Sequence, residues 1–166
     1  MMLEPIEPHV SFRLITSEDV ELLIHFFETL SDSTRKIFGF SFDREHAETW
    51  VKEGTSDPGM RRFLMFEHSP DSAAEPVMLG TVWLWNWTKQ VVWFGIIIAD
   101  AFQNKGYGSK LIQIAIEEAK KSNKGGILLS THKTNLRAQK LYQKHDFEII
   151  GEDSRGEYLM LLNFPV

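Results

Sequence analysis

The 166-residue sequence contains no cysteine, no long apolar run and no segment of low complexity. Without cysteine, disulfide bonds, thiolate nucleophiles and cysteine-based metal sites are all excluded. No apolar run reaches the roughly 18 residues that a membrane span requires. The start, MMLEPIEPHV, also lacks the basic stretch and apolar run of a secretory signal. We therefore expect a cytoplasmic protein without a membrane partner, built as a single domain over residues 1–166.

Metal and nucleic-acid partners are also disfavoured. The six histidines lack the H-x-x-x-H or H-E-x-x-H spacing of a zinc site, so the sequence predicts no bound metal. The formal net charge of −5 argues against nucleic acid as a partner. The basic residues are nevertheless concentrated, because residues 103–144 hold nine Lys or Arg and only two Glu. Two interpretations stay open for this stretch, a solvated helix surface and a site for an anionic small molecule.

The hydrophobic patterns of the first half predict strands and helices in alternation. We expect strand 9–16, a helix from Ser17 (as N-cap) to residue 30, a helix capped by Asp43 and reaching residue 52, and strand 60–68. A turn-rich loop, 69–76, then leads to two long apolar strands, 77–87 and 90–99. These two strands should pair as an antiparallel hairpin at the centre of the sheet, because both of their faces are apolar.

The second half continues with a helix over residues 106–123, which Gly125 and Gly126 are expected to end. It is followed by strand 127–131, helix 135–145 and a final hairpin of 147–153 with 157–163. The fold class predicted from this order is α/β (α+β), with one central twisted mixed sheet flanked by about four helices.

One segment between an apolar strand and an amphipathic helix, ADAFQNKGYGSKL at residues 99–111, has two glycines two positions apart. It lacks the spacing of a P-loop, and Leu111 stands where a dinucleotide fingerprint needs its third glycine. Gly106 and Gly108 have no side chain to block a pyrophosphate, and the N–H groups of residues 105–109 can point toward one. Taken alone, the segment is better explained as a tight structural turn.

A second pattern, NLRAQKLYQKHDF, begins at Asn135. Taken alone, Asn135 is a helix N-cap, while Ala138, Leu141 and Tyr142 form an ordinary core stripe at helical spacing.

Together, the two patterns resemble the GNAT superfamily of acetyl-CoA-dependent N-acetyltransferases. QNKGYG matches the superfamily's Q/R-x-x-G-x-G/A coenzyme A loop, and NLRAQKLY matches its later N-x-x-A-x-x-L-Y helix. The resemblance extends over residues 77–162 and implies a GNAT-like fold with acetyl-CoA as the co-substrate.

The resemblance also assigns roles to individual residues. Backbone groups of Ile96 and Ile98 would hold the pantetheine arm like an added strand, and Asn135 would bind the same arm. Tyr142 would direct its hydroxyl at the thioester sulfur as the catalytic proton donor. The pyrophosphate would be held by backbone N–H groups of Gln103, Asn104, Lys105, Gly106, Tyr107, Gly108 and Ser109.

The implied reaction transfers an acetyl group from acetyl-CoA to a primary amine of a small molecule, a peptide or a protein. Because the chain has no cysteine, direct attack of the amine on the thioester is the simplest mechanism. The sequence leaves the base for the amine open among Asp100, His132, Glu67 and a water chain. The alternative function is a non-catalytic acyl-CoA-binding or sensing module, and a homodimer is the assembly kept open.

Two positions depart from the family pattern. Asp100 stands where a proline is common, which we expect to loosen the turn. Asp146 replaces the glycine of the usual G-F pair, at a position that often needs a positive φ, which Asp tolerates better than most residues.

The central hairpin allows two interpretations at several positions. Gly95 either relieves crowding or marks a bulge where a ligand approaches. Trp83, Trp85 and Trp87 are expected on one sheet face, either packed in the core or forming the wall of an acceptor pocket. The phenylalanines of FGFSF, residues 38–42, either cap that cleft or seal the core.

Overall fold

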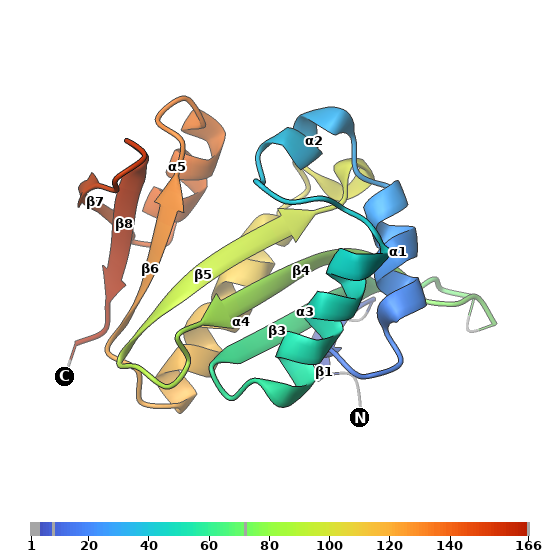
Figure 1. The fold of residues 1–166 in the computed structure, drawn as a ribbon. Coiled ribbons are helices and arrows are strands. Elements are labelled where there is room, and N and C mark those ends of the chain that lie inside the picture. The colour runs from blue at the N-terminus through green and yellow to red at the C-terminus, as the bar shows by residue number, and fades with distance from the viewer. Residues whose placement is uncertain (1–3, 8, 72, 166) are drawn as a thin grey trace.

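The computed structural model describes residues 4–7, 9–71 and 73–165 (Figure 1). Residues 1–3 and 8 of the segment MMLEPIEPHV and residue 72 of the expected loop 69–76 lie outside this range. The strands are β1 Glu4–Glu7, β2 Val10–Leu14, β3 Met60–Glu67, β4 Val77–Trp85, β5 Val91–Ile98, β6 Gly126–Thr131, β7 Glu148–Glu152 and β8 Tyr158–Asn163. The helices are α1 Val20–Glu28, α2 Asp32–Lys36, α3 Arg44–Ser56, α4 Tyr107–Lys121 and α5 Leu136–Lys144, with a 3₁₀ turn at Asp100–Phe102. The domain extent expected from the sequence, residues 1–166, stays a prediction.

The strands form one mixed sheet in the order β1-β2-β3-β4-β5-β6-β8-β7. Helices α1 and α3 cover one face, while α4 crosses the other (Figure 1). Each face has its own core, with Phe27 and Trp50 in one cluster and Leu111 and Ala115 in the other. The predicted fold class, a mixed sheet flanked by four main helices, is confirmed. Among the described residues, no helix is long and apolar enough to cross a membrane.

The predicted central hairpin is also confirmed. Strands β4 and β5 pair in antiparallel register, with Trp83 opposite Gly95, and three strands lie on each side of the pair. The last strand, β8, lies between β6 and β7 and is antiparallel to both. The final hairpin is therefore attached to the sheet through its second strand.

Helix starts were predicted with mixed success. Asp43 caps α3 as expected, because its carboxylate accepts a hydrogen bond from the His46 N–H at 2.9 Å. Ser17, however, is not the cap of α1, which begins at Val20 with Asp19 in the N-cap position. The Asp19 carboxylate accepts the Thr16 N–H at 2.7 Å instead, so the turn before the helix is longer than the sequence suggested.

Two short elements, β1 and α2, were not predicted, and one helix end was placed too late. Helix α4 ends at Lys121, and Asn123 takes a left-handed φ of 56°, as helix-ending residues commonly do. Gly126 does not end the helix but begins β6. Asp146 has a φ of 69°, the conformation that the G-F position was expected to need.

Gly95 is explained by crowding rather than by a bulge. The β4–β5 register runs without a shift through this position. A Cβ atom added at Gly95 would lie 2.4 Å from Cζ2 of Trp83, well inside van der Waals contact. The glycine therefore leaves the space that the Trp83 indole occupies beside the neighbouring strand.

We predict that Gly95→Ala destabilises the fold by about 1–3 kcal/mol, because the Trp83 ring must leave its position. Thermal unfolding should show a melting temperature lower by at least about 2 °C. Gly39→Ala is the matched control, since a Cβ atom there meets nothing within 4 Å. Equal melting temperatures for Gly95→Ala and the wild type would contradict the crowding interpretation.

Candidate active site

A cleft opens in the sheet where β5 and β6 separate. These parallel strands pair only from Val91 to Trp93 on β5, opposite Gly126 to Leu128 on β6. Beyond these residues the two strands diverge, with α5 beside β6 and α2 beyond the end of β5 (Figure 1). The opening forms a cavity of about 540 Å³. The divergence thus opens a cleft in the middle of the sheet.

One wall of the cleft is the edge of β5 itself. Residues 94–98 are paired with β4 on one side, while the β6 pairing has already ended. Ile96 and Ile98, the two predicted backbone contacts, both line the cleft. The Ile98 carbonyl accepts a hydrogen bond from Nε2 of Gln103 at 3.0 Å. The rest of this edge offers backbone donors and acceptors to an extended ligand.

The predicted phosphate loop lies at the entrance to α4. Asn104 and Gly106 have positive φ values of 62° and 86°, which turn the chain into the helix. No side chain caps α4, so the first N–H groups of the helix are available to an anion. Gln103, Asn104, Gly106, Gly108 and Ser109 all line the cleft.

The side chains of Lys105 and Tyr107 are not among those lining the cleft. The Lys105 ammonium lies 5.8 Å from the centre of the Phe102 ring. Tyr107 is buried, and its hydroxyl donates a hydrogen bond to Glu67 at 2.7 Å. Any part that these two residues play in binding is therefore limited to their backbone N–H groups.

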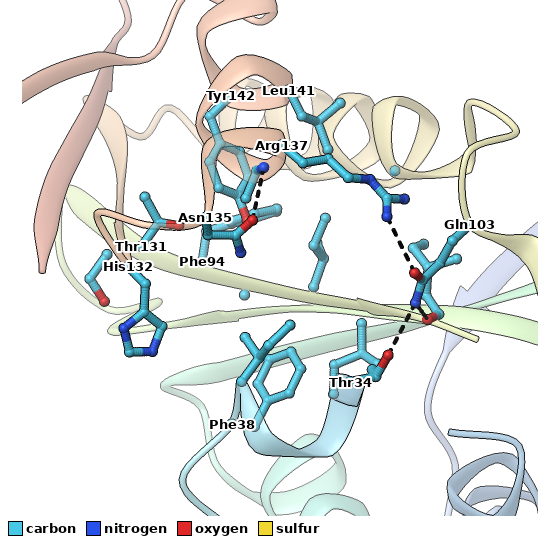
Figure 2. Close-up of a pocket in the computed structure, with 18 of the residues that line it drawn as sticks. Thr34, Phe38, Phe94, Gln103, Thr131, His132, Asn135, Arg137, Leu141 and Tyr142 are labelled. Atoms are coloured by element: carbon cyan, nitrogen blue, oxygen red, sulfur yellow. Dashed lines mark hydrogen bonds between the residues drawn. The ribbon is translucent and has the colours of Figure 1, made fainter. Parts of the chain in front are cut away.

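Arg137 and His145 also contact the loop, and the sequence patterns did not place either side chain there. Nη1 of Arg137 lies 3.4 Å from Oε1 of Gln103, across the cleft (Figure 2). Oγ of Ser109 lies 2.8 Å from Nε2 of His145. Burial, together with the charge of Lys144, lowers the pKa of His145 and so favours the neutral form of this imidazole. Of the nine basic residues in 103–144, only Arg137 lines the cleft.

Helix α5 supplies the two remaining predicted residues. Asn135 is its N-cap, with Oδ1 accepting the Ala138 N–H at 3.2 Å, and its side chain lines the cleft (Figure 2). Tyr142 also lines the cleft and packs edge-on against Phe94, with ring centres 6.1 Å apart. Burial raises the pKa of Tyr142 to about 12, so its hydroxyl keeps its proton at neutral pH.

The fold places the three candidate side-chain bases in different surroundings. The Asp100 carboxylate is held by Ser31, whose N–H lies 2.9 Å and whose hydroxyl lies 2.7 Å away, and by Thr34. Burial acts to raise the pKa of Asp100, but these hydrogen bonds outweigh it and leave the pKa below its usual value. Asp100 thus ties the turn to α2, and the expectation that it loosens the turn was wrong.

Glu67 accepts the Tyr107 hydroxyl and does not line the cleft, and neither does Asp100. His132 lines it, with Nε2 at 3.3 Å from Oε1 of Glu157. Glu157 had no motif to mark it, since the pairing of β6 with β8 alone brings it beside His132. It is the only carboxylate among the described residues that line the cleft.

Aromatic rings form part of the cleft wall. Trp83, Trp85 and Phe38 line it, and Trp85 stacks on Trp93 with ring centres 5.7 Å apart. Trp87 was wrongly expected on the same face. Asn86, with a φ of 56°, turns the chain, and Trp87 packs into the α4-side core instead.

A buried arginine lies against this wall. The Arg62 guanidinium carbon is 4.7 Å from the centre of the Trp83 ring and 3.8 Å from that of Trp50. Burial lowers the pKa of Arg62 to about 9. Its Nε and Nη1 atoms have no hydrogen-bond partner within the described part of the chain. The two indole rings are thus the main contacts of this charge.

The cleft fits an acyl-CoA ligand by its own chemistry. The β5 edge suits the amide groups of a pantetheine arm, and the uncapped α4 N-terminus with Arg137 suits phosphates. Residues 4–7, 9–71 and 73–165 contain no group of three or more histidine or carboxylate side chains placed to hold a metal ion, and the absence of a bound metal stays a prediction.

Comparisons with known proteins agree with this geometry. The sequence model of the Acetyltransferase (GNAT) family matches residues 24–147. Streptothricin acetyltransferase A of Bacillus subtilis (strain 168) is 34% identical over 80 residues, which are 48% of this chain and 44% of that protein. The match thus spans less than half the length of this relative.

Solved structures share the fold over nearly the whole chain. An acetyltransferase of the GNAT family from Streptococcus pneumoniae has a TM-score of 0.71 at 22% identity, covering 94% of this chain and 99% of that one. Spermidine N-acetyltransferase from Vibrio cholerae, in complex with CoA and spermine, has a TM-score of 0.70 at 22% identity, covering 95% and 96%. With the family match extending over most of its length, the chain belongs to the acetyltransferase (GNAT) family.

Proposed function

We propose that the protein transfers an acetyl group from acetyl-CoA to a primary amine. The observation that carries the proposal is the convergence on one cleft of an unpaired strand edge, an uncapped helix N-terminus and the Tyr142 hydroxyl. Family membership supports the same reaction class. Bound acetyl-CoA supplies the thioester, and the amine attacks its carbonyl carbon directly.

Different residues bind different parts of acetyl-CoA. Backbone groups of Ile96 and Ile98 hold the pantetheine arm, and the Nδ2 group of Asn135 is left to bind it, because Oδ1 caps α5. N–H groups from Asn104 to Ser109 hold the pyrophosphate, with Arg137 as an added cation. The Gln103 N–H, also predicted to bind it, donates instead to the Asp100 carbonyl at 3.3 Å. The arm thereby occupies the place that a strand beside β5 would take.

Tyr142 acts on the departing sulfur. Its pKa of about 12 lies above that of an ordinary thiol, near ~8.5, so complete proton transfer to a thiolate is uphill. A hydrogen bond from the hydroxyl nevertheless stabilises the negative charge as it develops on sulfur. The proton follows as the coenzyme leaves as a thiol, and solvent restores the tyrosine.

The acceptor is an amine of a small molecule, peptide or protein. A lysine-like amine of pKa ~10.4 is neutral only about once in 2,500 at pH 7, whereas an α-amine of pKa ~8 is neutral about a tenth of the time. The relatives named above act on streptothricin and spermidine, which supports an amine acceptor without choosing one. The homodimer considered from the sequence also stays a prediction.

The experiment that tests this function is an acetyl-CoA consumption screen over amines, including peptide N-termini, lysine peptides, polyamines and aminoglycosides. Acetylation of at least one amine class, confirmed by product mass, is the expected result. Tight coenzyme A binding without acetylation of any amine would favour the alternative, a non-catalytic acyl-CoA-binding or sensing module.

The first of three predictions from this function concerns the phosphate loop. Coenzyme A should raise the melting temperature of the wild type, because a ligand that binds only the native state stabilises it. Gly108→Val should abolish this shift by blocking the approach to the α4 N-terminus. The apo fold should survive, since a Cβ atom at position 108 meets only Cδ2 of Leu141, at 3.0 Å.

Gly125→Ala is the control for this measurement, because its Cβ atom makes only ordinary contacts outside the cleft. It should leave the coenzyme A shift intact. A normal shift in Gly108→Val would remove the loop from the binding site.

The second prediction concerns charge. Acetyl-CoA should bind several-fold more weakly as salt rises to about 0.5 M, because exposed charge interactions are screened. Arg137→Gln should weaken binding at low salt and flatten this salt dependence. Lys140→Gln, on the same helix but outside the cleft, should behave like the wild type in isothermal titration calorimetry. If the affinity for acetyl-CoA fell with salt at the same rate in all three proteins, Arg137 would be only solvated surface.

The third prediction concerns Tyr142. Tyr142→Phe keeps the ring packed on Phe94 and removes only the hydroxyl. With the acceptor from the screen, kcat should fall at least about tenfold, within the range typical of positioned acids. The Kd for acetyl-CoA should change less than about threefold, because the ring remains in the wall. A variant that turns over like the wild type would reduce Tyr142 to a core aromatic.

A further inference from the structure

His132 and Glu157 form a pair at the end of the cleft opposite the phosphate loop. His132 follows β6 directly and Glu157 precedes β8. Nε2 of the imidazole lies 3.3 Å from Oε1 of the carboxylate. In Figure 2, Gln103 and Arg137 lie on one side of Tyr142 and Asn135, and His132 lies on the other. An amine entering from the side away from the phosphates therefore meets His132.

The β7–β8 turn fixes the carboxylate of this pair. Oδ1 of Asp153 accepts the N–H groups of Arg155 at 2.8 Å and of Glu157 at 3.0 Å. Nη2 of Arg155 then donates to Oε2 of Glu157 at 2.9 Å. One carboxylate oxygen is thus held by arginine, and the other faces the imidazole. The Glu157 side chain is only 13% exposed, which limits its freedom to turn away.

The start of α5 fixes the backbone of the histidine. The His132 carbonyl accepts the Asn135 N–H at 3.0 Å and Nε2 of Gln139 at 3.0 Å. With the Nε2–H of His132 directed at Glu157, Nδ1 carries the lone pair. Among the described residues nothing is hydrogen-bonded to Nδ1, and the side chain is 52% exposed. The pair therefore leaves one proton-accepting atom, Nδ1, free of hydrogen bonds within the described part of the chain, on an imidazole that lines the cleft.

We propose that Nδ1 of His132 accepts the proton of the attacking amine and that Glu157 is the positioning residue that holds the imidazole in the Nε2–H tautomer. This inference rests on the proposed function. The nitrogen–carbon bond forms and the carbon–sulfur bond breaks. The ammonium form of the amine first gives one proton to Nδ1, which passes it to solvent, and the neutral nitrogen then attacks. As the carbon–sulfur bond breaks, the nitrogen loses its second proton to solvent, and the sulfur receives a proton from Tyr142, which solvent restores. The products are the acetylated amine and the free thiol of coenzyme A.

Among the described residues that line the cleft, Glu157 is the only carboxylate and His132 the only imidazole. Glu157 pairs with the imidazole, Arg155 pairs with both Glu157 and Asp153, and Lys133, the residue after His132, pairs with Glu152. The carboxylate stabilises the imidazolium that forms when the proton arrives.

The first test separates proton removal from positioning of the acceptor. Activity is compared between the amine found by the screen and the O-alkyl hydroxylamine of the same carbon skeleton, whose nitrogen is neutral at pH 7. His132→Gln should lower kcat at least about 100-fold for the amine and less than about threefold for the hydroxylamine. Raising the pH to about 9 should restore part of the lost activity, because more of a lysine-like amine is then neutral. Equal losses on both acceptors, or no loss, would overturn the proposal.

The second test reads the tautomer directly and needs no turnover. Nitrogen-15 NMR of the His132 imidazole should report the Nε2–H form in the wild type and a mixture of tautomers in Glu157→Gln. The same variant should lose about tenfold in kcat with an unchanged coenzyme A thermal shift. An unchanged tautomer in Glu157→Gln would refute the positioning role.

Lys133→Gln is the matched control, because Lys133 is adjacent in sequence, pairs with Glu152 and does not line the cleft. It should behave like the wild type in both tests. Failure of the proposed function would give a different result. Coenzyme A would still bind, but no amine in the screen would be acetylated, and the His132–Glu157 pair would then have no reaction in which to act. A loss confined to the amine in His132→Gln supports both.

Discussion

The separation of β5 from β6 is the constraint on which the site depends. Buried backbone N–H and C=O groups need partners, and a strand in the middle of a sheet normally finds them on both sides. Here β5 loses its partner after Trp93, although it remains central in the strand order. Both faces of this unpaired length are covered, by Trp83 over Gly95 on one and by α4 on the other, so its edge is the side that faces the cleft. A ligand that pairs with this edge completes the sheet.

The parts of the site that depend on local sequence were predictable. The apolar hairpin, the glycine loop at the start of α4 and the Asn135 cap each follow from rules that act within a few residues. The purely structural interpretations of these residues are also correct in part. Asn135 does cap its helix, and Tyr142 does pack in the core. What the sequence pattern added was their order along the chain.

Contacts between distant segments were not predictable from these patterns. Glu157 reaches the cleft only because β8 pairs with β6, which sets Tyr158 opposite Thr131. Asp100 was interpreted as a defect in a turn because its partner, Ser31, lies in a segment where no helix was expected. Trp87 leaves the face of Trp83 and Trp85 because a single residue, Asn86, takes a left-handed conformation. Each of these errors involves a pairing or a φ value that residue type alone does not determine.

The position of β8 between β6 and β7 has a consequence for biosynthesis. Strand β6, which carries His132 at its end, has a short pairing with β5 and gains its long antiparallel neighbour only when residues 158–163 are added. While the chain is still on the ribosome, α5 and β6 must therefore wait for the last strand before this half of the sheet is complete. Until then, the edge of β6 that later pairs with β8 has no partner, and an unpaired apolar strand edge is a site where chains can associate wrongly.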